Sequence, residues 1–72
     1  LHDELKDQLI ESSEEFRHLA EEHSALERRL DELSARPYLT EDEQMEEVRL
    51  KKLKLHLKDQ MEGMILQNEA SH

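Results

Sequence analysis

The chain has 72 residues, no cysteine and a formal net charge of −9, and 40% of its residues are charged. Its length allows one domain at most, and because disulfides are excluded, so small a core needs regular helix packing, a metal or association with another chain. A single glycine and a single proline, in a composition rich in Leu, Glu, Lys, Arg and Ala, favour long helices over sheets.

Apolar residues in the first half of the chain recur at alternating steps of three and four. This heptad spacing predicts a helix over about residues 3–34 whose apolar seam packs against a second helix. The rest of its surface is acidic, since residues 1–34 hold eleven acidic and four basic side chains. His23 occupies a seam position, where a polar group commonly selects register or partner. The seam residues are Leu5, Leu9, Phe16, Leu19, His23, Leu26, Leu30 and Leu33, with Ser12 at one skipped position.

A turn is predicted over residues 35–40, between the two halves of the chain. Pro37 has no N–H to continue a helix and favours an extended conformation at Arg36. Thr40 and Glu43 have the spacing of a capping box, in which each side chain accepts a hydrogen bond from the backbone N–H of the other residue. A connection this short makes the flanking helices antiparallel neighbours.

The second helix, predicted over about residues 41–67, carries apolar stripes on two nearly opposite sides. One stripe packs on the first helix, so the expected hairpin seam consists of Leu19, His23, Leu26, Leu30, Leu50, Leu53 and Leu57. The hairpin leaves the other stripe uncovered, which makes its residues the candidate contact between chains: Val48, Leu55 and Leu66. The alternative is that these are ordinary exposed apolar residues. The predicted fold class is all-α, an antiparallel two-helix hairpin forming one domain over residues 1–72 and assembling into a dimeric or larger helical bundle.

The second helix also contains a basic run without any acidic residue. Antiparallel pairing is expected to bring Lys51, Lys52 and Lys54 beside Glu21 and Glu22, where exposed ion pairs fix orientation more than stability. The alternative function of the run is contact with nucleic acid or another polyanion. The net charge of −9 and the presence of only two aromatic residues argue against it. The run consists of Arg49, Lys51, Lys52, Lys54 and Lys58.

Three segments of the chain resemble the YdcH-like family of small bacterial proteins: Phe16–Leu19, Glu22–Glu27 and Glu47–Met61. The last contains the family pattern Leu-Lys-Lys-x-Lys-Leu-x-Leu-Lys-Asp. The resemblance implies an oligomeric, cytoplasmic helical hairpin of unassigned function, and supplies no active site. The chain departs from the family pattern at Ser12–Glu15, where relatives tend to carry an Asn-Pro pair. The first helix therefore either continues through Ser12 or starts afresh there with a serine cap.

The predicted function is protein-protein interaction or scaffolding, and not catalysis. Two helices with charged outer faces offer no concavity of the size that a substrate needs. Glu15 and His18 have the Glu-x-x-His spacing of di-iron bundles, but a solvated helix face explains them better, so no metal or cofactor is expected. The expected partner is a second copy of the chain or another helical protein, with no small-molecule substrate.

Cytoplasmic location is the expected one. No apolar run is long enough to cross a bilayer, and the first residues lack the basic and then apolar pattern of a signal peptide. A third hypothesis takes the chain as a coiled-coil segment of a longer protein, because it does not begin with methionine.

Overall fold

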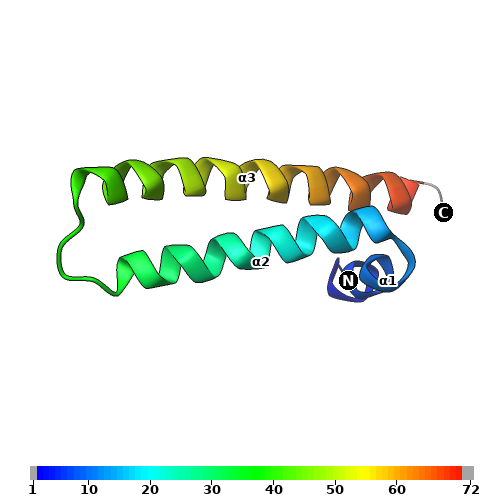
Figure 1. The fold of residues 1–72 in the computed structure, drawn as a ribbon. Helices are drawn as coiled ribbons and strands as arrows, with labels where there is room; N and C mark the ends of the chain where they lie inside the picture. Colours follow the sequence, from blue (N-terminus) through cyan, green and yellow to red (C-terminus); the bar gives the residue numbers. More distant parts are fainter. Residues whose placement is uncertain (1, 71–72) are drawn as a thin grey trace.

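The computed structural model describes the backbone of residues 2–70 and the side chains of residue 4 and residues 6–68. Three helices account for most of this part: α1 (His2–Ser12), α2 (Glu14–Ser34) and α3 (Glu41–Ala70). The two long helices, α2 and α3, run antiparallel side by side, and α1 folds back beneath their open end (Figure 1). Since residues 2–70 contain no strand, the all-α prediction is confirmed, but the two-helix hairpin has to be corrected to three helices.

The predicted first helix over about residues 3–34 is divided at Ser13. Its backbone is extended there, with φ −121° and ψ 116°, and its Oγ accepts a hydrogen bond from the Phe16 N–H at 3.2 Å, which makes Ser13 the N-cap of α2. The Ser13 N–H still donates to the Leu9 carbonyl at 2.8 Å and closes α1. Serine side chains offer the backbone hydrogen bonds that compete with a continuous helix. The structure thus adopts the serine-capped alternative, one residue later than Ser12.

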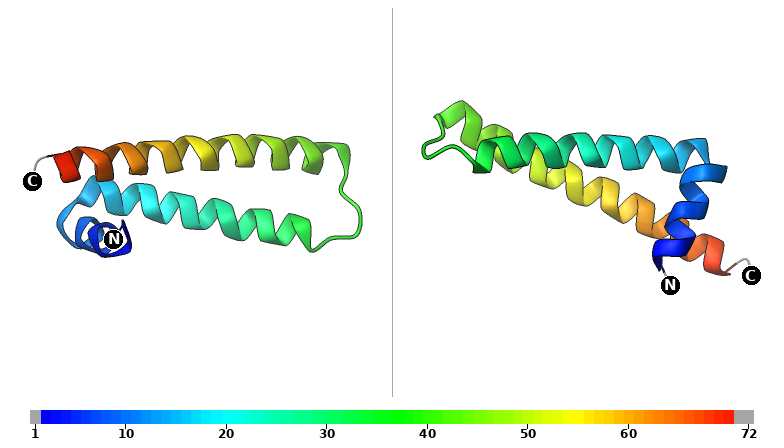
Figure 2. Two further views of the ribbon diagram at one scale, coloured as in Figure 1. Left: turned by 180° about the vertical axis from the view of Figure 1, so that it is seen from behind. Right: turned by 90° about the horizontal axis from the view of Figure 1, so that it is seen from below.

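The core lies where the three helices meet. Phe16 of α2 is fully buried, in a cluster with Met61 and Ile65 of α3. Figure 2 shows α1 crossing from the start of α2 towards the far end of α3, and this placement lets Leu9 and Ile10 of α1 pack against the cluster. A straight helix through Ser13 would carry these two residues past the end of the hairpin, so the bend at Ser13 completes the core. The side chain of Leu5, also expected in the seam, lies outside the described residues.

The opposite end of the hairpin combines one fully buried leucine, Leu33, with polar contacts. The Glu43 N–H donates to Thr40 Oγ1 at 3.1 Å and the Thr40 N–H donates to Glu43 Oε1 at 3.0 Å, so the predicted capping box is confirmed. The other carboxylate oxygen of Glu43 pairs with Arg36, which precedes Pro37 in the connecting loop. The loop is therefore tied to the first turn of α3.

The predicted seam differs in how deeply its residues are buried. Leu57 is buried, whereas Leu53 is 47% exposed and does not belong to the core. A step of four residues turns a helix by about 40°. Leu57 and Ile65 are one such step from Met61 and stay close to the inward side, whereas Leu53 is two steps from Met61 and lies about 80° away from it. The remaining seam residues are intermediate in burial: Leu19, His23, Leu26, Leu30 and Leu50.

Replacing Ser13 with alanine should lower the free energy of unfolding by about 1 kcal/mol, because the N-cap hydrogen bond to Phe16 is lost. Urea unfolding followed by circular dichroism measures this difference. The matched control is Ser12→Ala, since the Ser12 hydroxyl only donates to the Gln8 carbonyl within α1. Equal stability of the two variants would show that Ser13 does not cap α2.

Candidate interaction surface

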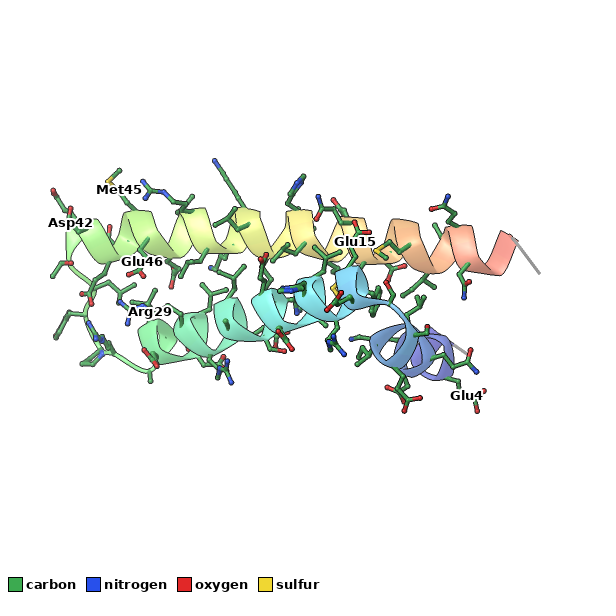
Figure 3. The ribbon with its side chains drawn as sticks, turned by 45° about the vertical axis from the view of Figure 1, so that its right-hand side comes forward. Glu4, Glu15, Arg29, Asp42, Met45 and Glu46 are labelled. Atoms are coloured by element: carbon green, nitrogen blue, oxygen red, sulfur yellow. The ribbon has the colours of Figure 1, made fainter. Side chains whose placement is uncertain are left out.

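A row of exposed apolar side chains runs along α3, mostly on the side that faces away from α2; at the edge of that side, Leu55 also lines a hollow with Leu30, Asp31 and Ser34 of α2. We call this row the outer row; its exposed fractions are 61% for Met45, 52% for Val48, 59% for Leu55 and 57% for Leu66. Figure 3 shows Met45 directed away from α2, while the adjacent Glu46 points towards it. The row contains the three residues predicted as the contact between chains and adds Met45, whose spacing of three from Val48 is the sequence signal for it.

Helix geometry accounts for the position of the outer row. The inward side of α3 is fixed by the burial of Met61 between α2 and α1. At about 100° per residue, every residue of the outer row lies roughly 120–160° around the helix from Met61. Within the described part of the chain, the elements that contact α3 are α1 and α2, and both pack on its inward side. The outer side of α3 is therefore left uncovered by the chain's own helices.

A second apolar area lies at the side of the hairpin, between α2 and α3. Leu53 lines a surface hollow of about 280 Å³ together with Leu26 and Leu57. Ala25, Glu22 and His56 complete its wall. Leu53 therefore lies at the rim of the hairpin seam, beside buried Leu57 and half-buried Leu26.

An ion pair that the sequence analysis did not predict joins the long helices. Arg29 Nε donates to Glu46 Oε2 and Arg29 Nη2 to Glu46 Oε1, both at 2.9 Å, and Arg29 Nη1 also bonds to Glu32 at 3.1 Å. Figure 3 shows Arg29 and Glu46 directed towards one another across the gap between α2 and α3. These hydrogen bonds lower the pKa of Glu46 below its usual 4.5 and raise the pKa of Arg29. The two-point contact fixes the register of the helices.

The predicted pairing of Lys51, Lys52 and Lys54 with Glu21 and Glu22 is not formed in the described part of the chain. Lys51 instead pairs with Glu47 of its own helix at 3.7 Å. At about 100° per residue, Glu21 lies on the opposite side of α2 from the seam residue Leu30, so it cannot reach α3.

The structure divides the basic run between two surfaces. Lys51, Lys54 and Lys58 line a hollow that also contains the carboxylates of Asp31 and Glu47. Arg49 and Lys52 lie on the outer side of α3, where they line a shallow hollow with Gln44, Met45 and Val48. The five basic residues proposed as a polyanion contact therefore do not form one uniformly positive surface.

The histidines and acidic residues of the described part of the chain show no arrangement for a metal. His23 Nδ1 lies 2.9 Å from Glu27 Oε1 on the same helix, so this seam histidine has a partner one turn away. Glu15 and His18 are both exposed. Among the described residues, no three His, Cys, Asp or Glu side chains are grouped to hold a metal ion. None of the helices, over the residues described, is both long and apolar enough to cross a membrane.

The Glu46→Gln substitution should lower stability at neutral pH and lose its effect in acid. Because the folded pKa of Glu46 is below 4.5, the unfolded chain binds more protons, and the stabilisation is present above about pH 4.5 and lost as the pH falls through the folded value. Urea unfolding of both proteins between neutral and acidic pH measures the difference. The control is Glu21→Gln, an exposed carboxylate of α2. A difference between Glu46→Gln and the native chain that does not change with pH would contradict the role of the Arg29 pair.

Comparison with known proteins identifies the family. A family model described as "Protein of unknown function (DUF465)" matches residues 16–65, well over half of the chain. The curated proteins contain no match to the chain, and neither do the solved structures. The matched segment begins at Phe16 and ends at Ile65, two members of the buried cluster. The chain is a member of this family, to which the YdcH-like small bacterial proteins belong, as its sequence resemblance predicted.

Proposed function

We propose that this chain is a non-enzymatic helical interaction module that associates with a second copy of itself through the outer row of α3. The observation that supports the proposal is the outer row itself, four large apolar side chains on one side of one helix, each more than half exposed. From Met45 to Leu66 it extends along the helix by about 31 Å, at 1.5 Å per residue. Single exposed apolar residues are ordinary, but four large ones on one side of one helix indicate a contact surface.

The small core of the single chain favours association. Five apolar residues are buried in the described part of the chain: Phe16, Leu33, Leu57, Met61 and Ile65. A core of this size gives a chain of this length little stability unless disulfides, a metal or another chain contribute. Because the sequence has no cysteine, burial of the outer row by a second chain is a direct source of the missing apolar contact.

The polar residues also favour an interaction module over an enzyme. No polar or charged side chain is buried among the residues described. Catalytic groups, by contrast, depend on polar neighbours held in place away from bulk water. Two ion pairs have a structural role between elements: Arg29–Glu46 connects α2 to α3, and Arg36–Glu43 connects the loop to α3.

Leu55→Glu should convert the associated protein to monomer. Burial of a leucine side chain contributes about 1.5–3 kcal/mol, so losing it from both copies should raise the dissociation constant by more than about tenfold. Light scattering over about a hundredfold range of concentration, with circular dichroism on the same samples, measures mass and helicity together. The matched control is Tyr38→Glu, an exposed aromatic residue in the loop, away from the outer row. A native chain that stays monomeric throughout, or a Leu55→Glu variant with unchanged mass, would contradict the proposal.

A further inference from the structure

We infer that two copies of the chain pair through α3 in antiparallel orientation, about a two-fold axis that passes close to Leu55 and His56. This inference rests on the proposed self-association and adds the geometry of the pair. The occupant of the outer side of α3 is thus a second α3, running in the opposite direction. The observations that carry it are the order of charges, the order of apolar side chains and the position of Gly63 along this side of the helix.

The charges change sign along the outer side of α3. Lys52 lies before Leu55 and Asp59 lies after it, and both side chains are exposed. At about 100° per residue the two lie within roughly 20° of one another around the helix. A two-fold axis between Leu55 and His56 brings Lys52 of each copy opposite Asp59 of the other. Parallel pairing would instead place Lys52 against Lys52 and Asp59 against Asp59, and like charges in contact are unfavourable.

The apolar residues match in the same register. Met45 and Leu66 lie about equally far from the axis, in opposite directions, so each meets the other residue of the second copy. Leu55 lies at the axis and meets its own equivalent. The three side chains are all more than half exposed in the single chain, and this register covers each of them with apolar surface.

Gly63 is the residue opposite Val48 in this register. Its φ is negative, and a methyl group added at its Cα would meet nothing within 4 Å, so the fold of the single chain does not require glycine there. Glycine inside a helix is destabilising relative to alanine. Close approach of the Val48 side chain from the second copy accounts for a residue without a side chain at this position.

Disulfide cross-linking tests the orientation, because the native chain has no cysteine. In a glutathione redox buffer, Leu55→Cys should form covalent dimer about tenfold or more faster than Leu66→Cys, since only residues near the axis meet their equivalents. A mixture of Met45→Cys and Leu66→Cys should cross-link to each other. Tyr38→Cys gives the rate of random collision for an exposed cysteine outside the contact.

The outcomes separate the geometry from the self-association itself. Rapid cross-linking of Leu66→Cys to itself, in a protein that light scattering finds dimeric, would overturn the antiparallel pair and leave the association intact. A monomeric protein in which every cysteine reacts at the Tyr38→Cys rate would overturn both.

Charge exchange gives a second test that leaves the apolar contact unchanged. Lys52→Asp and Asp59→Lys should each raise the dissociation constant by about three- to tenfold, because each creates like-charge contacts twice in the dimer. The double variant should return to the native value, since the opposite charges are restored with their positions exchanged. Failure of the double variant to recover, with helicity unchanged, would overturn the proposed register.

Discussion

Phe16 loses all contact with solvent because three helices meet around it. Its position at the third residue of α2, three residues after the Ser13 cap, determines much of the remaining structure. The chain must bend before it so that Leu9 and Ile10 of α1 can pack against the cluster that contains Phe16. Met61 and Ile65 belong to the same cluster, which fixes the face that α3 turns inwards. The opposite face of α3, with the outer row, is then the one left to solvent.

The two ends of the hairpin are stabilised by different kinds of interaction. Near Phe16 the contacts are apolar and depend on burial, which contributes in proportion to the area removed from water. Near the loop, one fully buried leucine, Leu33, is accompanied by hydrogen bonds and ion pairs at the surface, formed by the Thr40–Glu43 capping box and by Arg36 and Arg29. The polar end fixes which residues of α2 and α3 face one another, and the apolar end provides most of the burial.

Features set by local chemistry could be predicted from the sequence. Pro37 and the spacing of Thr40 and Glu43 identify the turn and the start of the second long helix, because proline geometry and capping act within a few residues. The seam pattern identifies the helical content and the inward side of each long helix approximately. The exposed stripe of α3 also follows from periodicity alone, since Val48, Leu55 and Leu66 lie away from the seam.

Features set by contacts between distant residues could not be predicted in the same way. Ser13 could either cap a new helix or continue the preceding one. Which conformation forms depends on whether the bend lets Leu9 and Ile10 pack against the buried cluster, and those contacts are distant in the sequence. The exposure of Leu53 depends on where the buried line of α3 is centred. The Arg29–Glu46 pair depends on the register of the two long helices. The sequence contains 19 acidic residues, and nothing in it marks Glu46 as the one that pairs with Arg29.

In the proposed dimer, Phe16 is buried within one chain, while the outer row of α3 is buried between chains. Isotope-filtered nuclear Overhauser spectroscopy on an equal mixture of labelled and unlabelled protein separates the two kinds of contact in one measurement. We expect contacts of the Phe16 ring to Leu9 and Ile10 only within a chain, and contacts between chains only from the outer row, with Met45 near Leu66 of the other copy. Contacts between chains from the Phe16 ring to Leu9 or Ile10 would contradict the account, because they would show that α1 packs on a neighbouring molecule.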